Sequence, residues 1–358
     1  MRLSGRRALV AVALVAAASA FASSADPPGG RRPAADAQSR PEVAAPVTTA
    51  ATTTTTSTTT TTVPPTYPLT GRRAPDAEVL ARAVVTLKID NSAAARPQAG
   101  LEHADVVYEE FTEGITRLVA LFHSSDADVA GPVRSVRPAD ADIATVAGGV
   151  LAFSGGSPAA VAVAAASPLT LVTEGDREAM YRRPGRPAPY NLYTSTAVLR
   201  TRAPAEAAQP PPPFAPFLPE GAAFSAPEAT PAGSIELVPA PLLTASYAWD
   251  GESGTWRRST DGAPHRLEGD AQLAPTTVIV QFAEYRTFEA DAAVQYPEVV
   301  GSGEAWVFAG GMTARATWTK PSAGEPTVYT AVDGSPIVLP PGQTWVHLVA
   351  PDSPVSVG

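Results

Sequence analysis

Cysteine is absent from the 358-residue chain, and lysine occurs only at Lys88 and Lys320. Without cysteine the chain has no disulfide, no thiolate zinc site, no cysteine nucleophile and no N-terminal cysteine that could carry a lipid. The four histidines offer little material for a histidine metal cage, so we expect neither a metal nor a cofactor. Acidic residues outnumber basic ones by 35 to 26, which argues against a nucleic-acid partner.

Long apolar runs are also lacking, apart from a short one at the N-terminus. Residues 1–25 combine three arginines, an apolar stretch over 8–18 and small residues at several cleavage sites, a pattern typical of a secretory signal peptide. The stretch is short for a membrane span, which needs about 20 apolar residues. The alternative is an uncleaved signal anchor, which would be the protein's only membrane attachment. We expect an extracytoplasmic protein, secreted or associated with the cell envelope, and not a lipoprotein.

Residues 26–66 contain no aromatic side chain and no regularly spaced apolar positions. Twelve of the fifteen residues from 48 to 62 are threonine, and Pro64 and Pro65 follow. Such a tract buries too little apolar surface to offset its chain entropy, so the sequence predicts a disordered stalk. Stalks of this composition are often O-glycosylated, and a plain tether is the alternative.

The rest of the chain divides into two blocks around a proline-rich segment. In residues 67–202, apolar strand patterns alternate with short helical ones, which predicts an α/β or α+β N-terminal domain. The expected strands are 84–89, 105–111, 115–123 and 150–153, and the expected helices are 139–147 and 159–166. Residues 203–233 contain nine prolines. We interpret them as a bridge between domains, with an ordered arm packed over one domain as the alternative.

Residues 234–358 contain all five tryptophans and several Gly-rich or Asp-Gly turns. This pattern predicts a β-rich C-terminal domain, a small sandwich or barrel. The expected strands are 246–249, 255–258, 277–282, 304–308, 312–318, 328–329, 337–339 and 344–349, and the one helix candidate is 284–293. Trp249 and Trp256 could stack on sugar rings, but core packing is the more common role of tryptophan in a hairpin.

Polar residues in the first block gather at strand ends and in loops. The ligand-binding candidates are Asp90, Asn91, Arg96, Glu109, Glu113, Arg117, Arg134, Arg137, Ser157, Asn191 and Tyr193. Open α/β sheets bind ligands beyond the carboxyl ends of their strands, where Asp90, Asn91 and Ser157 are expected. Arg134 and Arg137 lie three positions apart between prolines and suit a carboxylate, a phosphate or a uronate.

Glu109 and Glu110 lie on opposite faces of an apolar strand, so at least one of them needs a buried partner. Arg117 is the natural candidate, and an internal ion pair of this kind would stabilise the fold without serving a ligand. Alternatively, Asp90 with Glu109 or Glu113 could supply paired carboxylates for acid/base chemistry on a glycan, or ligate a hard cation. The segment 155–157 matches neither the nucleophile elbow nor the P-loop.

Several motifs of the chain occur in the same order as in the YerB-like family of exported bacterial proteins, which the chain resembles. They are Ile89–Asn91, Ala95–Leu101, Ala104–Glu109, Glu113–Arg117, Gly131–Arg137, Gly155–Pro158, Asn191–Ser195, Gly301–Gly303, Thr317–Lys320 and Pro341–Trp345. The resemblance covers about residues 67–350 and implies a two-domain architecture and export. It implies no reaction, because the function of the family is unknown. Many members look like lipoproteins with a lipobox cysteine, and this sequence departs from them there.

Three hypotheses about function follow. The first is a cell-envelope protein that binds an acidic ligand, such as a cell-wall polymer, or an envelope protein through the cleft of the first block. The second is an envelope hydrolase of glycan or phosphodiester linkages, with Asp90, Glu109 or Glu113 as acid or base. It predicts two carboxylates about 5–9.5 Å apart in a cleft, and pairing of these acids with arginines in the dry interior would count against it. The third makes the motifs a scaffold for an interaction surface.

Overall fold

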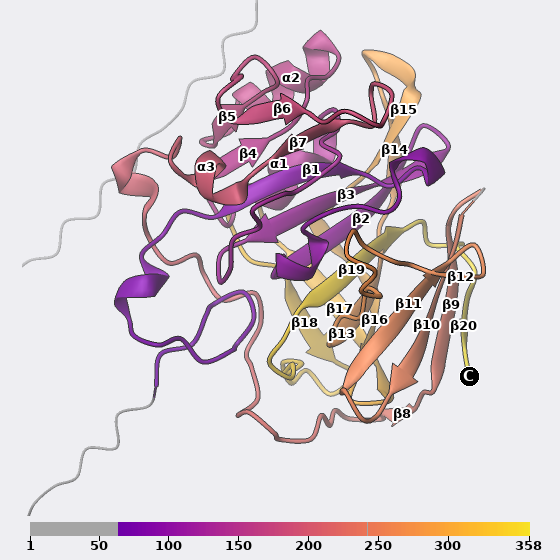
Figure 1. Cartoon of the computed structure of the whole chain (residues 1–358). Helices are drawn as coiled ribbons and strands as arrows, with labels where there is room; N and C mark the ends of the chain where they lie inside the picture. Colours follow the sequence, from indigo (N-terminus) through magenta and orange to yellow (C-terminus); the bar gives the residue numbers. More distant parts are fainter. Residues whose placement is uncertain (1–63, 242) are drawn as a thin grey trace, which may run out of the picture. The chain divides into compact units, whose positions relative to one another are not determined.

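The computed structural model describes residues 64–241 and 243–358 (Figure 1). The predicted signal peptide and the stalk up to residue 63 lie outside the described residues. Residues 64–66 belong to the folded part, because Ala74 N donates to Pro65 O at 2.8 Å and Thr66 pairs with Arg73. No helix in the described part is long and apolar enough to cross a membrane.

Both blocks contribute strands to one eleven-stranded mixed sheet, with the order β18-β17-β16-β13-β19-β2-β3-β1-β4-β5 and with β8 beside β17. The strands are β1 (Val85–Asp90), β2 (Val106–Thr112), β3 (Ile115–Phe122), β4 (Val150–Ala152), β5 (Thr170–Val172), β8 (Thr230–Pro231), β13 (Thr277–Phe282), β16 (Gly301–Ala309), β17 (Met312–Lys320), β18 (Val328–Ala331) and β19 (Thr344–Val349). In its middle, β2 of the first block and β19 of the second pair in parallel. The purple and yellow strands therefore run side by side in Figure 1.

A second sheet of five strands, in the order β12-β11-β10-β9-β20, comes from the second block. Its strands are β9 (Ser234–Ala240), β10 (Leu243–Asp250), β11 (Thr255–Thr260), β12 (Ala263–Pro264) and β20 (Val355–Val357). Apolar residues such as Tyr247 and Trp256 pack against Val278 and Phe308 of the large sheet. Trp256 is buried in this interface, which is the core role for tryptophan and not a sugar platform.

Helices α1 (Pro138–Ala144) and α2 (Pro158–Ala165) cover the other face of the large sheet in the first block, where Ala144 and Ala160 pack with Leu151. The short α3 (Thr196–Arg200) packs through Leu199 against Leu87 on the opposite face. Single 3₁₀ turns lie at 78–80, 93–95, 101–103 and 205–207. Because β1 and β19 are covered on both faces, every one of their residues is buried, as in the near-continuous apolar strands of α/β proteins. The first block is therefore a mixed α/β unit and the second is β-rich, as the sequence predicts.

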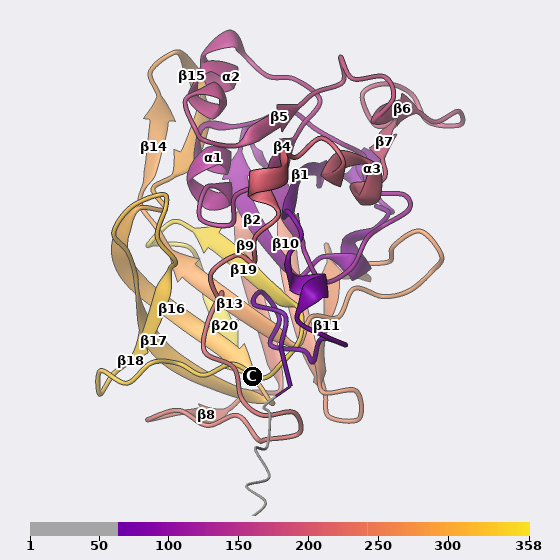
Figure 2. The same cartoon turned by 90° about the vertical axis from the view of Figure 1, so that its left-hand side faces the viewer.

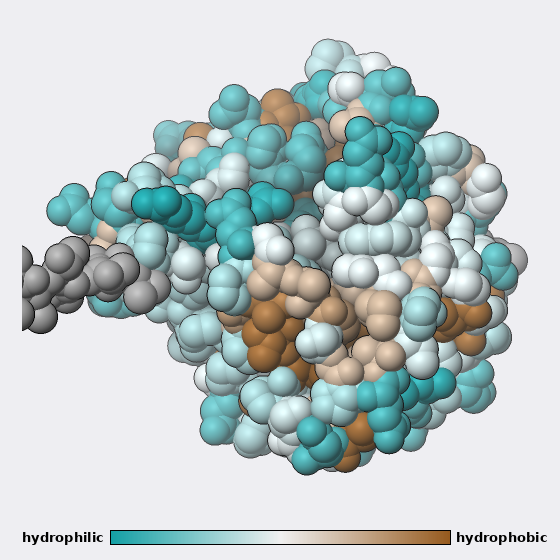
Figure 3. Space-filling view, turned by 90° about the horizontal axis from the view of Figure 1, so that it is seen from below, coloured by the Kyte–Doolittle hydropathy of each residue, from teal (hydrophilic) through white to brown (hydrophobic). Residues whose placement is uncertain are grey.

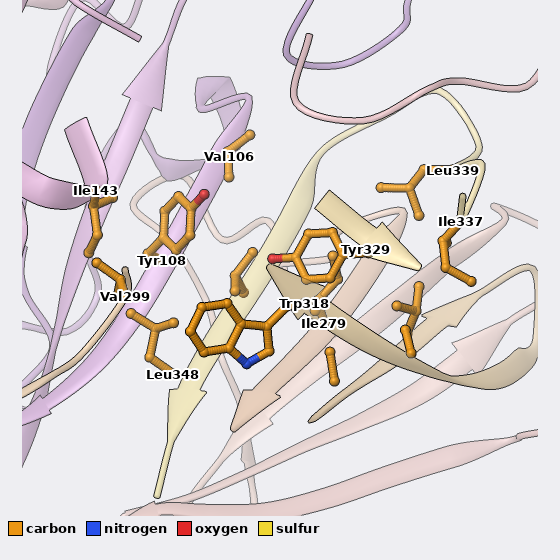
Figure 4. Packing of buried hydrophobic residues seen from close by; sticks show 14 of the residues in the cluster. Val106, Tyr108, Ile143, Ile279, Val299, Trp318, Tyr329, Ile337, Leu339 and Leu348 are labelled. Atoms are coloured by element: carbon orange, nitrogen blue, oxygen red, sulfur yellow. The ribbon is translucent and has the colours of Figure 1, made fainter. Parts of the chain in front are cut away.

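The largest apolar core spans the two blocks. Ile143 of α1, Tyr108 of β2 and Leu348 of β19 pack in the same cluster as Trp318 of β17 and Tyr329 of β18. Figure 4 shows the rings of Trp318 and Tyr329 between the strands of the second block and the side chains of the first. Residues from the two blocks thus bury their apolar surface against each other, which is the main stabilising contribution in folding.

Most expected strands and both expected helices occur within three residues of their predicted bounds, but two predictions are wrong. The helix candidate 284–293 is instead the hairpin of β14 (Tyr285–Phe288) and β15 (Asp291–Pro297), whose register is Tyr285 opposite Pro297. The expected strand 337–339 makes only isolated bridges, through Pro336 and Leu339. Prolines at 336, 340 and 341 remove the N–H donors that a strand ladder needs there.

The proline-rich segment 203–233 is an ordered arm, the alternative stated for it from the sequence. Phe214 N donates to Pro68 O at 3.0 Å, and Leu218 N donates to Leu339 O at 2.8 Å. The side chains of Phe214 and Phe217 pack against the large core. Seen from below, the most prominent group of apolar residues lies near the centre of the view, and smaller groups lie to the right, at the bottom and near the top (Figure 3).

Candidate functional site

Five of the predicted site residues form one group, which we call the arginine cluster: Asp90, Glu113, Arg117, Arg134 and Arg137. β1 ends at Asp90, β3 places Arg117 directly opposite it, and Glu113 lies in the turn between β2 and β3. Arg134 and Arg137 come from the loop before α1. The cluster thus forms at the carboxyl end of β1, where the sequence predicts a ligand site.

Asp90 is shared between two arginines. Its Oδ2 lies 3.0 Å from Arg134 Nε, and its Oδ1 lies 3.7 Å from Arg117 Nη1. The same Oδ1 accepts a hydrogen bond from the backbone amide of Ser92 at 2.8 Å. Asp90 is buried, and these contacts give its carboxylate partners in the interior, where an unpaired one would be costly.

Glu113 is shared in the same way. Arg117 Nη2 donates to its Oε2 at 3.1 Å, and Arg137 forms an ion pair with the same oxygen. Burial alone would raise the pKa of Glu113, but Arg137 and Arg117 lower it below its usual range. The backbone of Glu113 has φ of 51°, in the left-handed region, and Gly114 follows at 83°. This turn brings the carboxylate back over the arginines.

The cluster therefore contains three guanidinium groups and two carboxylates. Only 4% of the Arg117 side chain and 9% of the Arg137 side chain are exposed. Within the described residues, four donor atoms of the cluster are buried without a hydrogen-bond acceptor, and one acceptor, Asp90 Oδ2, is buried without a donor. The donors are Arg117 Nε, Arg117 Nη1, Arg134 Nε and Arg137 Nε. Burial and the neighbouring guanidiniums lower the pKa of Arg117 despite the nearby Asp90. The site has more buried donors than acceptors.

A small cleft of about 230 Å³ opens beside the cluster, and we call it the Arg137 cleft. Its wall consists of Glu113, Ser135, Arg137, Gly156, Ser157, Ala160, Phe288, Asp291 and Val294. Ser157 caps α2, its Oγ accepting a hydrogen bond from Ala160 N at 3.2 Å. The positive end of the α2 dipole therefore lies at the cleft. Phe288, Asp291 and Val294 come from the β14–β15 hairpin, so both blocks build the wall.

The other predicted carboxylate, Glu109, lies on the opposite face of the sheet. Arg258 Nη1 of β11 donates to its Oε2 at 2.7 Å, and Trp345 Nε1 of β19 donates to the same oxygen at 3.0 Å. Asn91 Nδ2 and Thr116 Oγ1 donate to Oε1 at 3.0 and 2.8 Å. Burial would raise the pKa of Glu109, but Arg258 and the other contacts lower it to about 2.

Two histidines extend this buried network. Arg258 Nε lies 3.2 Å from His265 Nδ1, and His347 Nε2 lies 2.8 Å from Tyr247 Oη. Burial, reinforced by Arg258, lowers the pKa of each histidine to about 3, so both rings are neutral at physiological pH. His265 Nε2 reaches Gln98 Oε1 at 2.9 Å. The network joins β2, β11 and β19 and has no exposed charge.

Arg117, which the sequence predicts as the partner of a buried glutamate in β2, has other partners in the structure. Glu109 pairs with Arg258, and Glu110 pairs with Lys88, whereas Arg117 pairs with Asp90 and Glu113. Each carboxylate offered as an acid or base for hydrolysis is thus held by arginine. This pairing counts against the hydrolase hypothesis for Asp90 and Glu109, which are buried, whereas Glu113 is partly exposed and lines the Arg137 cleft described above.

Lys88 forms a third charged group, which sequence reasoning missed. Its Nζ donates to Asp140 Oδ1 at 2.6 Å and also bonds to Glu110, and all three side chains are buried. Burial, opposed by Lys88 and reinforced by Asp140, raises the pKa of Glu110 to about 7. Asp140 Oδ2 accepts the amide of Arg137 at 2.7 Å, so this group supports the start of α1. The sequence feature that could have revealed this group is Lys88 itself, a single charged residue within an apolar strand.

The remaining candidates do not line the Arg137 cleft. Arg96 pairs with Asp261 at 3.2 Å, beside a wide depression that Arg266 and Asp270 also line. Asn191 Oδ1 accepts a hydrogen bond from Arg182 at 2.6 Å. Tyr193 Oη donates to Glu268 Oε1 at 3.3 Å. No group of three His, Asp or Glu side chains in the described part could hold a metal ion.

Two family models described as "Protein of unknown function (DUF3048)" match the chain, the N-terminal domain over residues 69–209 and the C-terminal domain over 239–346. The chain belongs to the DUF3048 family. The strands of both DUF3048 domains meet in one sheet, at β2 and β19.

A relative in this family is "Putative lipoprotein YerB" of Bacillus subtilis (strain 168), which is 25% identical over 292 residues, or 79% of this chain and 85% of YerB. The crystal structure of YerB protein from Bacillus subtilis has the same fold, with a TM-score of 0.70 at 24% identity, covering 82% of this chain and 99% of that one. The resemblance to the YerB-like family is therefore confirmed. The DUF3048 family has no established function.

Proposed function

We propose that this protein acts outside the cytoplasm and binds an acidic group, a carboxylate or a phosphate, of a cell-envelope ligand in the Arg137 cleft. The observation that carries the proposal is the unequal number of charges in the arginine cluster, where two buried guanidinium groups and the partly exposed one of Arg134 share two carboxylates. One of those guanidiniums, Arg137, lies in the wall of the cleft.

The energetic argument rests on the unmatched donors. A buried charge without enough partners destabilises the folded state, and an incoming anion would supply the missing acceptors. Guanidinium groups bind carboxylate and phosphate through planar, paired hydrogen bonds. The N-terminal end of α2, which also lines the cleft, favours the same charge.

The size of the cleft limits the ligand. At about 230 Å³ it is smaller than the roughly 300–1,000 Å³ typical of sites that enclose a drug-sized molecule. It accommodates a small molecule or the terminal group of a larger one. This agrees with an envelope polymer that presents acidic ends or branches.

Two observations support a location outside the cytoplasm. Residues 1–25 have the pattern of a secretory signal, and the relative YerB carries the name of a putative lipoprotein. Since this sequence contains no cysteine, we further propose that its export does not involve a lipid-modified cysteine. Mass spectrometry of the protein purified from its own cells tests this, because a cleaved N-terminus without added lipid mass is the expected result.

Binding is tested by calorimetry on the purified protein with two soluble probes. One is a muropeptide, which carries carboxylates, and the other is a glycerol phosphate polymer, which carries phosphates. We expect saturable binding of one of them, which identifies the acidic group. Arg137→Gln should weaken it about tenfold or more, the effect of losing one charge-assisted contact. The matched control is Arg315→Gln, which removes an exposed arginine paired with Glu304.

Because Arg137 also supports α1, a second variant protects the test from misfolding. Ser135 lines the cleft, and Ser135→Leu fills part of it without removing a charge. Both variants are first shown to keep the wild-type circular dichroism and urea midpoint. Absence of binding by the wild type to either probe, or unchanged binding by both folded variants, overturns the proposal.

A further inference from the structure

The β14–β15 hairpin brings a second carboxylate to the Arg137 cleft, besides that of Glu113, which Arg137 and Arg117 already hold. Asp291 lies at the start of β15, and its carboxylate is part of the cleft wall that also contains Arg137. Its Oδ1 accepts a hydrogen bond from the amide of Ala293 at 3.1 Å. Among the described residues this backbone amide is the one hydrogen-bond donor to the Asp291 carboxylate. Asp291 therefore has acceptor capacity left for a ligand.

The cleft wall also has an apolar part. Phe288 packs against the small core formed by α1, α2 and β4, and Val294 is buried. Both line the cleft together with Ala160 of α2. A short aliphatic segment of a ligand would cover this apolar surface.

The hairpin that carries Asp291 is fixed to the main sheet. Tyr285 Oη at its base donates to Leu348 O of β19 at 2.8 Å and accepts the amide of Phe111 of β2 at 3.1 Å. Its other end lies beside α1 and α2 in both views (Figures 1 and 2). Arg137, next to the start of α1, and Asp291, on the hairpin, are thus positioned before a ligand arrives, which reduces the entropy lost on binding.

We propose that the ligand of the Arg137 cleft is a compact zwitterion, a free amino acid or an amino-acid end of a larger molecule that keeps both its ammonium and its carboxylate. The carboxylate would meet Arg137 and the N-terminal end of α2, and the ammonium would meet Asp291. The aliphatic part would lie against Phe288 and Val294. This inference rests on the proposed function and specifies its ligand.

Pairs of probes that differ in one charge test the inference. Ligand-detected NMR and calorimetry on the full protein compare alanine, in both enantiomers, with propionate, which lacks the ammonium, and ethylamine, which lacks the carboxylate. We expect one alanine enantiomer to bind about two- to fivefold more tightly than propionate, the factor that an ion pair near the surface supplies. Ethylamine should not bind measurably.

Two variants separate this inference from the proposed function. Asp291→Asn should reduce alanine binding to the level of propionate and leave propionate binding unchanged, whereas Arg137→Gln should weaken both. Glu289→Gln, on the same hairpin but outside the cleft wall, is the matched control. If propionate binds and alanine binds no more tightly, the zwitterion inference is wrong and the acidic-group proposal stands. If neither binds and the polymer probes also fail, both are wrong.

Discussion

Arg258 on β11 and Glu109 on β2 form a fully buried ion pair, with Nη1 2.7 Å from Oε2, although 149 positions separate them in the sequence. The Arg258 guanidinium also lies 4.7 Å from the centre of the Trp345 ring. The pair joins the five-stranded sheet of the second block to the central strand of the first. Its hydrogen bonds are internal, so we assign it to the stability of the fold.

Glu109→Gln should destabilise the protein by about 3–5 kcal/mol, because it leaves the Arg258 charge buried without its counter-charge. The urea midpoint of unfolding at pH 7 measures this loss. The double variant Glu109→Leu with Arg258→Met should recover part of the stability, since it removes both charges from the interior.

The exposed pair of Glu304 and Arg315 is the control for this prediction. Glu304→Gln should change the free energy of unfolding by no more than about 1 kcal/mol. A loss from Glu109→Gln as small as that of the control would show that water reaches Arg258.

The stability of the protein should fall as the pH rises, because Glu110 binds a proton more tightly in the folded state than in the unfolded chain. Its pKa is raised from 4.5 to about 7 in the folded state by burial and by Asp140, so folding retains a proton that the unfolded chain releases. The stability linked to that proton is complete below pH 4.5 and is lost as the pH rises through 7. Glu110→Gln mimics the protonated form and should become more stable than the wild type over this interval.

Urea unfolding of both proteins at steps from pH 4.5 to 8 measures the difference. The gain of Glu110→Gln should grow with pH and reach a plateau of up to about 3 kcal/mol, the value of roughly 2.5 pKa units. Glu304→Gln, at an exposed carboxylate, should follow the wild type in parallel. A constant offset between wild type and Glu110→Gln would mean that Lys88 keeps Glu110 ionised throughout.

Much of the fold could be predicted from the sequence because the signals are local. The strand 277–282 is apolar and β-branched, and it forms β13 with those bounds. Proline and serine before the alanines of 159–166 predict the start of α2, and Ser157 caps it. The hairpin at 285–297 was not predicted from the sequence. The parts of the fold that hold it in place, Leu348 and α2, are distant from it in the sequence. Tertiary contacts override the weak local preference there.

The site was predictable only in part for the same reason. Asp90, Arg134 and Arg137 could be located, since polar residues at strand ends and rigid loops are visible in the sequence. The partner of Glu109 could not, because Arg258 belongs to another sheet. Asp291 also could not be found, since one acid in a hairpin turn carries no signal of the cleft that it faces.

Phe217→Ala should loosen the proline-rich arm. The Phe217 ring lies directly over Gly71, where an added Cβ would come within 2.3 Å of the ring. Since Phe217 is only partly buried, we expect a loss of about 2 kcal/mol, less than for a core phenylalanine. Proteinase K should then cleave within 203–233 several times faster than in the wild type.

Mass spectrometry of the early fragments locates the cleavage. Glu220→Ala, at an exposed position of the same arm, should leave the rate unchanged. Rapid cleavage of the wild-type arm under native conditions would contradict its ordered packing and support a loose bridge between the blocks.

Gly148 and Gly149 provide a matched pair of substitutions before β4. Both have left-handed backbones, with φ of 68° and 76°. A Cβ on Gly148 would meet no atom within 4 Å, whereas one on Gly149 would lie 2.1 Å from the carbonyl oxygen of Val84. Gly148→Ala should therefore cost about 1–2 kcal/mol, the backbone penalty alone. Gly149→Ala should cost about 1–3 kcal/mol more, because the register of β4 against β1 must shift. Equal urea midpoints for the two variants would show that β4 is not held against Val84.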